Sequence, residues 1–282
     1  MKDKIQNFFG LFLKPFRKHC RKEMAATSNL VDVNDTITID VYEVKKSRPT
    51  VFIHPILGGS NRVSEFFAAY FNIFHRWNVV IVHRSAYPFE SNDPESFNNK
   101  LKDIESAFQQ VYDWSVKYFE HNHFHFTGTS MGAIVGATLV PYIPFRSFIC
   151  IMGGGSIPNV MLTSSMSRFT EWYERQVPKY GETREQVERN YMKHIDRDPV
   201  VNADDTHSHK MLMFSCLFDR VVHTRTQSRL NRAFKKNFIS PLRFWLPCGH
   251  YTIALFIPII MPIVSIFLFY REIKSRFEEE FK

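Results

Sequence analysis

Short runs of apolar residues alternate with longer stretches of helical periodicity over most of this 282-residue chain. Runs that are almost wholly apolar are typical of strands covered on both faces, and apolar residues three and four positions apart are typical of helices with one buried face. The pattern predicts strands at 36–44, 50–54, 78–83, 124–127, 147–152, 210–217 and 241–246, and helices at 60–77, 100–119, 131–140, 182–194 and 224–236.

Strands that alternate with helices predict β-α-β units, and therefore an α/β fold with a mainly parallel central sheet and helices on both faces. In the helix at 60–77, we expect Phe66, Phe67, Tyr70 and Phe74 to point inward. We expect one domain over residues 36–282, preceded by a basic amphipathic extension over residues 1–35. Ligands of parallel sheets bind beyond the carboxyl ends of the strands, so polar residues that follow the predicted strands are candidates for a site.

The sequence Gly-Thr-Ser-Met-Gly at 128–132 joins a predicted strand to a predicted helix. This context predicts a sharp turn that presents the hydroxyl of Ser130 clear of the sheet. The two glycines let the strand and the helix approach closely, and the amides at the start of the helix favour a developing negative charge. A plain strand-to-helix turn remains the alternative.

Two further candidates follow later strands: Asp219 after the strand at 210–217, and His250 after the strand at 241–246. Asp219 has a second interpretation as a cap of the helix that begins at residue 224. Asp204 and Asp205 are rival acids, but they precede their strand and so belong to the opposite edge of the sheet. His54 follows a strand too, and we expect it to shape a loop rather than act as a base.

The elbow around Ser130, Asp219 at a strand end and Cys-Gly-His at 248–250 together resemble the α/β-hydrolase superfamily over about residues 36–270. The resemblance implies a catalytic triad in the order Ser130, Asp219, His250. The sequence His-Pro-Ile-Leu-Gly-Gly at 54–59 is similar to the oxyanion loop of that superfamily, and Asp-Pro at 198–199 is similar to esterase-like members. Pro55 has no amide proton, so the oxyanion donors implied are the amide of Met131 with that of Ile56 or, second, Leu57.

Composition narrows the class of protein. The formal charge is +8 and the sequence pI about 9.3. The basic residues are scattered apart from two clusters, at 14–22 and 225–236, and no nucleic-acid-binding motif is present, so we expect no nucleic acid partner. None of the four cysteines forms a C-x-x-C pair, which favours a reducing, cytoplasmic compartment over a disulfide framework. Histidines alternate at 121, 123, 125, 207 and 209 as metal ligands can, but the first three straddle a strand, where alternation is typical of one exposed face. We expect neither a metal nor a cofactor.

Three stretches have two interpretations each. Residues 156–209 interrupt the strand–helix rhythm and read either as a lid over the strand ends or as an extra surface helix pair. Residues 1–23 have apolar residues at helical spacing with basic residues between and after them, which predicts a basic amphipathic helix that either packs on the domain or lies on an anionic membrane. Residues 251–270 carry no charge and read either as a helix packed on the sheet or as a membrane-facing segment.

The resemblance implies a serine hydrolase that cleaves carboxylic esters or thioesters of an apolar acyl group through an acyl-serine intermediate. A catalytically silent binding or membrane-associated scaffold is the alternative, motivated by Pro55. Acyl transfer to an alcohol is the third hypothesis and uses the same residues.

Overall fold

A computed structural model of the protein describes residues 19–25, 36–56, 61–83, 91, 93–203, 210–235 and 240–280. Its strands are β1 (His19–Ala25), β2 (Thr36–Tyr42), β3 (Thr50–His54), β4 (Asn78–His83), β5 (Phe124–Thr129), β6 (Ser147–Ile151), β7 (Met211–Cys216) and β8 (Leu242–Leu246). Its helices are α2 (Asn61–Tyr70), η1 (Phe71–His75), α3 (Pro94–Phe119), α4 (Met131–Leu139), α5 (Ile157–Thr163), α6 (Ser167–Tyr180), α7 (Arg184–Met192), α8 (Thr224–Ala233), η4 (Thr252–Phe256) and α9 (Ile257–Glu280).

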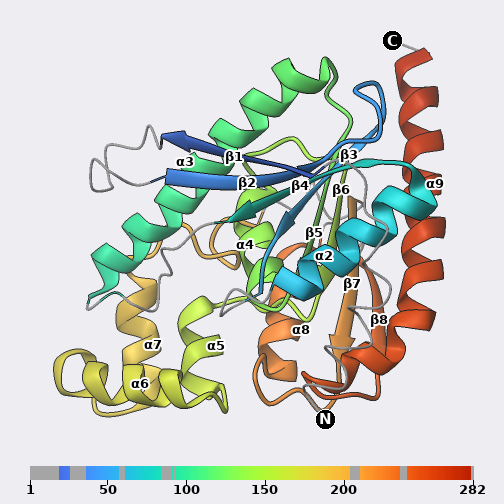
Figure 1. Ribbon diagram of the computed structural model, residues 1–282. Helices are drawn as coiled ribbons and strands as arrows, with labels where there is room; N and C mark the ends of the chain where they lie inside the picture. Colours follow the sequence, from blue (N-terminus) through green and yellow to red (C-terminus); the bar gives the residue numbers. More distant parts are fainter. Residues whose placement is uncertain are drawn as a thin grey trace.

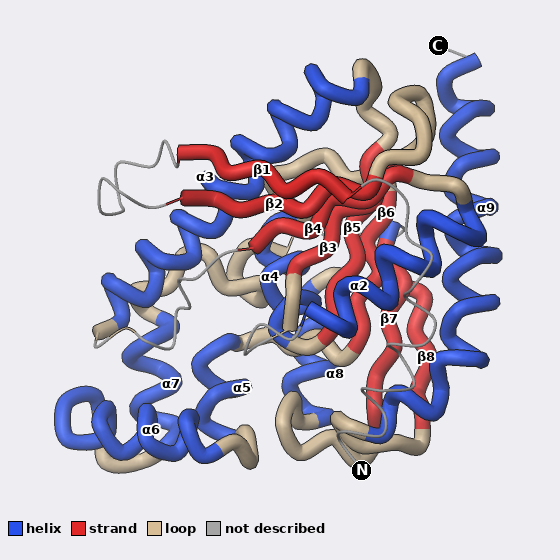
Figure 2. Tube along the Cα trace, in the orientation of Figure 1, coloured by secondary structure: helices blue, strands red, loops and turns tan. Residues whose placement is uncertain are grey.

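The strands form one 8-stranded sheet in the order β1-β2-β4-β3-β5-β6-β7-β8 (Figures 1 and 2). Every pair from β4 across to β8 is parallel, and only the β1–β2 and β2–β4 pairs are antiparallel. This is the mainly parallel α/β sheet that the sequence predicts. The carboxyl ends of β3, β5, β6, β7 and β8 therefore meet at one edge.

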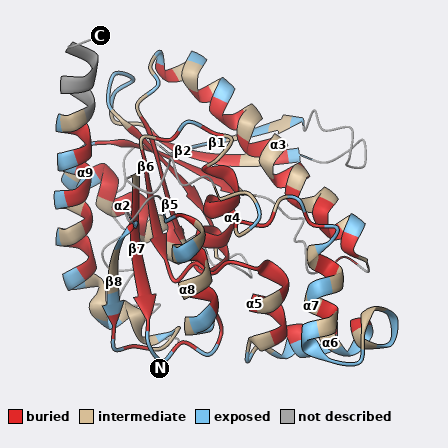
Figure 3. Ribbon diagram, turned by 180° about the vertical axis from the view of Figure 1, so that it is seen from behind, coloured by how far each residue is buried: buried red, intermediate tan, exposed pale blue. Residues whose placement is uncertain are grey.

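Alternate residues of the central strands enter two separate hydrophobic cores. In β6, Phe148 and Cys150 face a core shared with α3, α4 and α8, whereas Ile149 and Ile151 face a core shared with α2 and α9. The burial view shows the strands buried between the helices of both faces (Figure 3). The apolar runs of the sequence are continuous because each strand is covered on both sides.

The chain before β2 contributes to this sheet. The helical pattern that we identified over residues 1–23 lies mostly outside the described residues, but its last positions, 19–23, belong to strand β1, so for these positions the helix prediction is wrong. β1 pairs with β2 over its whole length, and Arg21 donates to the Asp40 carboxylate at 2.8 Å. Hydrogen bonding to an otherwise unpaired sheet edge overrides the local helical periodicity.

The prediction that Phe74 points inward is also wrong. Phe67 is buried, but Phe74 is 74% exposed. The predicted helix at 60–77 is regular only to Tyr70, after which Phe71–His75 forms a π-helical turn that ends at Arg76 in a left-handed conformation. The wider turn changes the angular spacing between successive residues, so the inward face does not continue to Phe74.

The apolar segment at 251–270 forms η4 and most of α9, along one side of the molecule (Figure 1). Ile260, Val264 and Leu268 are at most 1% exposed and pack into the core shared with α2. By length and composition, Thr252–Lys274 is sufficient to cross a membrane. Its most apolar 18-residue window has a mean hydropathy of 2.6, and only 28% of that window is buried. This helix is therefore packed on the sheet by one face and exposed on the other.

Candidate active site

The strand-to-helix turn at Ser130 has the strained geometry that the sequence predicts. Ser130 lies at φ 55° and ψ −118°, a conformation that costs a serine roughly 1–3 kcal/mol, and its amide donates to the Ile151 carbonyl at 2.8 Å. A Cβ atom added to Gly128 would come within 2.2 Å of the Gly132 carbonyl oxygen. The turn therefore requires glycine at position 128, and it holds Ser130 at the carboxyl end of β5.

The loop after β3 lies against the first turn of α4. A Cβ atom on Gly132 would lie 2.3 Å from the carbonyl oxygen of His54 and 3.4 Å from that of Pro55. This contact brings the segment that continues to Ile56 beside the start of the helix, where the Met131 amide has no intrahelical acceptor. Leu57, the second oxyanion candidate of this loop, lies outside the described residues.

His54 itself is fully buried beside this turn, and its Nδ1 lies 2.8 Å from the Pro55 carbonyl oxygen. Burial lowers the pKa of His54 to about 4, so the imidazole is neutral near pH 7. A neutral, buried ring that is bonded to its own loop fits a structural role and adds no positive charge to the site.

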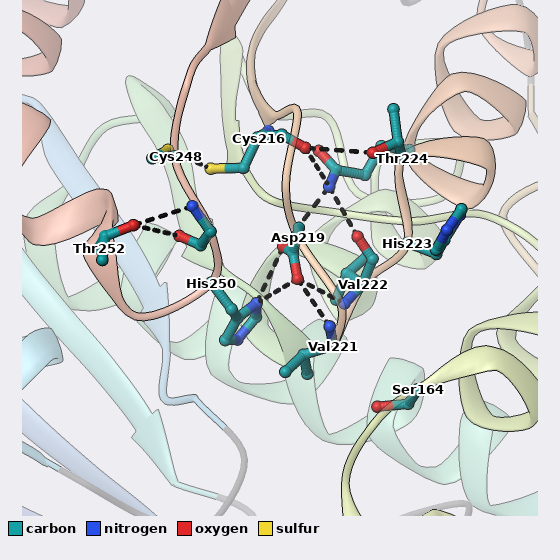
Figure 4. Close-up of polar contacts among 12 residues, drawn as sticks. Ser164, Cys216, Asp219, Val221, Val222, His223, Thr224, Cys248, His250 and Thr252 are labelled. Carbon is teal, nitrogen blue, oxygen red and sulfur yellow. Dashed lines mark hydrogen bonds and ion pairs between the residues drawn. The ribbon is translucent and has the colours of Figure 1, made fainter.

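The acid and histidine candidates are in direct contact. His250 Nδ1 lies 3.1 Å and 3.0 Å from the two carboxylate oxygens of Asp219, which is fully buried, while the imidazole is 13% exposed. Figure 4 shows the two side chains pointing toward each other from the loops after β7 and β8. Because an ionised carboxylate only accepts hydrogen bonds, Nδ1 is the donor, and Nε2 of the neutral ring is left as an acceptor.

Backbone amides hold Asp219 in this position. Its Oδ1 accepts the amides of Val221 at 2.8 Å and Val222 at 2.9 Å. The cap of α8 is His223, whose Nδ1 accepts the Arg225 amide, so the alternative that Asp219 caps this helix is wrong. The turn at residues 219–222 orients the carboxylate toward the histidine instead.

Gln227 of α8 supports the same turn, and the sequence analysis did not predict a role for this residue. Its side-chain amide donates to the Val222 carbonyl at 2.7 Å, lies 3.5 Å from Asp219 Oδ2, and accepts the Cys216 amide at 3.1 Å. Gln227 is completely buried. The signal in the sequence was a polar side chain three residues before Leu230, on the face of α8 that packs inward.

The loops that carry the three candidates are linked at one edge of the sheet. The Ser130 amide donates to the carbonyl of Ile151, the last residue of β6, and the Met152 amide donates to the Phe214 carbonyl of β7. The Phe218 amide donates to the Cys248 carbonyl. Among the described residues, however, none forms a hydrogen bond with the Ser130 hydroxyl, His250 included. The structure thus places Asp219 and His250 in hydrogen-bond contact, and it shows no hydrogen bond between His250 and Ser130.

Helices α5–α7 form the insertion between β6 and β7, next to this edge of the sheet (Figure 1). Polar contacts hold it there. The buried Asp198 carboxylate accepts the amides of Ser156 at 3.1 Å and Ile157 at 2.5 Å, and the partly buried Arg229 of α8 pairs with Glu188 of α7. The larger apolar side chains of its first half, Met161, Phe169 and Trp172, are at most 3% exposed. They pack in the core and do not line an open acyl pocket.

Comparison with solved structures shows the same fold over most of the chain. No protein-family model and no curated protein matches the sequence. Among solved structures, an esterase of the archaeon Pyrobaculum calidifontis superposes with a TM-score of 0.64 at 15% identity, over 97% of this chain and 88% of that one. The carboxylesterase EstE1 from a metagenomic library gives a TM-score of 0.60 at 12% identity, over 97% and 95%. A thermostable esterase of Pseudomonas putida gives 0.58 at 13%, over 95% and 88%.

Proposed function

Because this chain has the α/β-hydrolase fold, we propose that it is a serine hydrolase that cleaves carboxylic esters, with Ser130, Asp219 and His250 as its catalytic residues. The hydrogen bond between Asp219 and His250 carries the proposal, because it leaves Nε2 as a base at the sheet edge where Ser130 lies. The ester-cleaving neighbours support the same reaction class at low sequence identity.

In the proposed reaction, the Ser130 hydroxyl attacks the ester carbonyl while His250 Nε2 takes its proton. The tetrahedral oxyanion would be held by the amide of Met131 and that of Ile56 or Leu57. The carbon–oxygen bond to the leaving group then breaks, and His250 returns the proton to the departing alcohol. Water attacks the acyl-serine with His250 again as the base, which releases the carboxylic acid and regenerates Ser130. Asp219 stabilises the imidazolium that forms twice in this cycle.

The same residues would cleave thioesters, with a thiol as the leaving group, or transfer the acyl group to an alcohol in place of water. The second candidate function is a catalytically silent scaffold. Pro55 favours it, because the oxyanion loop lacks an amide proton at that position. The two functions differ in turnover, because a silent scaffold would hydrolyse no ester.

Labelling with a fluorophosphonate probe tests the nucleophile. The wild-type chain and a Ser165→Ala control, altered at an exposed serine next to α6, should both be labelled, and Ser130→Ala should not. Labelling that persists in Ser130→Ala, or that is absent from folded wild type, contradicts the proposal. Circular dichroism of each variant distinguishes loss of the nucleophile from loss of the fold.

Turnover of a series of p-nitrophenyl esters of graded acyl length tests the base and the acyl preference. Replacing His250 with alanine should reduce kcat by on the order of 10⁴-fold or more, because the hydroxyl loses its proton acceptor. A folded wild type that turns over no ester of the series supports the scaffold instead.

A further inference from the structure

From Leu255 to Ile273, the outward face of η4 and α9 is formed by apolar and aromatic side chains. A helix on a protein surface normally presents polar residues to water and apolar residues to the core. Here the core face is apolar as well, and no charged residue occurs from Tyr251 to Tyr270. The exposed positions between η4 and the charged end of the helix are Leu255, Pro258, Ile259, Pro262, Ile266, Phe269, Tyr270 and Ile273.

This face continues onto a second element. The hydroxyl of Tyr70 donates to the Met261 carbonyl at 2.8 Å, and the Tyr70 ring lies 5.4 Å from that of Phe74. The π-helical turn η1 therefore presents Phe74 and its neighbour Ile73 beside α9. Phe74 is 74% exposed and Ile73 46% exposed. In Figure 3, exposed residues mark the outer side of α9 along its described length.

At its other end the face reaches the candidate active site. Tyr251 directly follows His250 and is 70% exposed, and Phe218 directly precedes Asp219 and is 68% exposed. The two loops are bonded to each other, because the Phe218 amide donates to the Cys248 carbonyl at 3.0 Å. The apolar face, defined by Phe218, Tyr251, Phe74 and the exposed positions of η4 and α9, thus connects the loops of the proposed catalytic pair to the side of the molecule.

We propose that this apolar face rests on a lipid membrane and that, as far as the proposed function holds, the substrates are acyl esters drawn from that membrane. Protein interfaces surround an apolar centre with a polar rim, whereas the Tyr270 hydroxyl is the one polar side-chain group among the exposed positions from Leu255 to Ile273. The stripe also includes the aromatic side chains of Tyr251, Phe269 and Tyr270, and aromatic residues are enriched at the level of the lipid headgroups, where an interfacial helix lies.

Position and charge also favour lipid over a second copy of this chain. A protein partner on the face would cover the loops of Asp219 and His250, whereas a membrane there delivers acyl chains to them. The net charge of +8 attracts the chain to anionic lipid surfaces.

The helix would lie along the membrane and not cross it. Its inner face is packed on the sheet through Ile260, Val264 and Leu268. The Glu272 carboxylate bonds His125 Nε2 at 2.9 Å, deep in the sheet. Spanning would remove these contacts and expose one face of the sheet, so the arrangement that fits is an interfacial helix.

Flotation of the full chain with vesicles tests the membrane contact. We expect wild type to float with phosphatidylcholine vesicles that contain phosphatidylglycerol, and more weakly with phosphatidylcholine alone. Ile266→Asp and Phe269→Asp should each weaken binding by about tenfold or more, because each removes a large apolar side chain from the contact and adds a charge. Phe74→Asp should weaken it too, from a different element. Val201→Asp is the matched control, since Val201 is 52% exposed and outside the face.

The remaining outcomes separate this proposal from the hydrolase proposal. Turnover of a water-soluble short ester should be unchanged in Ile266→Asp, while turnover of a long-chain ester carried in vesicles should fall with binding. A third result is that wild type floats, the face variants do not, and no ester is turned over. This result would support the membrane contact and contradict both the lipid-ester substrate and the hydrolase function. Wild type that remains unbound with both vesicles overturns the proposal. A dimer that Ile266→Asp dissociates, measured by light scattering, overturns it in favour of a second copy.

Discussion

Gly132 of α4 lies so close to His54 that any side chain at position 132 would overlap the His54 carbonyl oxygen, which is 2.3 Å from an added Cβ. Two segments separated by more than seventy residues are thus in contact at the backbone. The contact fixes the loop that carries Ile56 against the amide end of the helix. It is the feature on which the proposed oxyanion site depends.

We therefore expect Gly132→Ala to displace the His54–Ile56 loop. The strain should lower the free energy of unfolding by about 1–3 kcal/mol and reduce kcat for ester hydrolysis. Ser165→Ala, at an exposed serine next to α6 and outside this contact, is the control. Urea unfolding and ester turnover measure the two effects, and unchanged values in Gly132→Ala would refute the close contact.

Asp219→Asn should separate geometry from charge. The amide oxygen of asparagine can still accept the Val221 and Val222 amides, so the turn should remain folded. The asparagine cannot stabilise the His250 cation and favours the wrong imidazole tautomer, so we expect kcat to fall by about 10³–10⁴-fold with little change in KM. A kcat within a factor of about ten of wild type would show that Asp219 does not act through His250 in the reaction.

Glu272 should make the attachment of α9 sensitive to pH. Burial alone would raise its pKa, but hydrogen bonds with His123 and His125, and the nearby Arg146, lower it. A lowered carboxyl pKa stabilises the fold above the unfolded value of about 4.5, and this contribution is lost as the pH falls below that value. Burial lowers the pKa of His125, which also disfavours the fold in acid.

We expect Glu272→Gln to lower the free energy of unfolding by about 1–3 kcal/mol at about pH 7, with the difference from wild type shrinking below about pH 4.5. Urea unfolding across this range measures it. The control is Glu171→Gln, at an exposed position of α6, which should match wild type throughout. A constant difference at all pH values would mean that the ionised carboxylate is not what holds α9.

Cys216 and Cys248, at the ends of β7 and β8, have sulfur atoms 2.8 Å apart, and both thiols are free. We predict that diamide converts them to a disulfide, the two thiol hydrogens passing to the reagent. Burial raises the pKa of both thiols, so the reactive thiolate is scarce and the reaction should be faster at about pH 9 than at about pH 7.

Alkylation after unfolding, followed by mass spectrometry, counts the thiols that remain. The experiment uses a Cys20→Ser background, because Cys20 is exposed and would compete. If both Cys216 and Cys248 are alkylated after treatment, the predicted pairing is wrong.

The sequence by itself determined the mainly parallel sheet and the order of the strands from β2 to β8 along the chain. Runs such as 78–83 and 147–151 are apolar at nearly every position because both faces of a parallel sheet are buried, and this signal is local. The same local signals placed Ser130, Asp219 and His250 after strands, and hence at one edge. The glycines at 128 and 132 predicted the elbow for the same reason, since the steric demand lies within five residues.

Only the tertiary structure decided which of several local tendencies was realised. Residues 19–23 became a strand because an unpaired edge of β2 was available to them, and Asp219 bonded His250 instead of capping α8 because the loops after β7 and β8 are neighbours in space. Phe74 and the outer side of α9 are exposed although their residues are apolar. An apolar side chain is more stable when it is buried, but whether neighbouring elements can cover it depends on the whole fold.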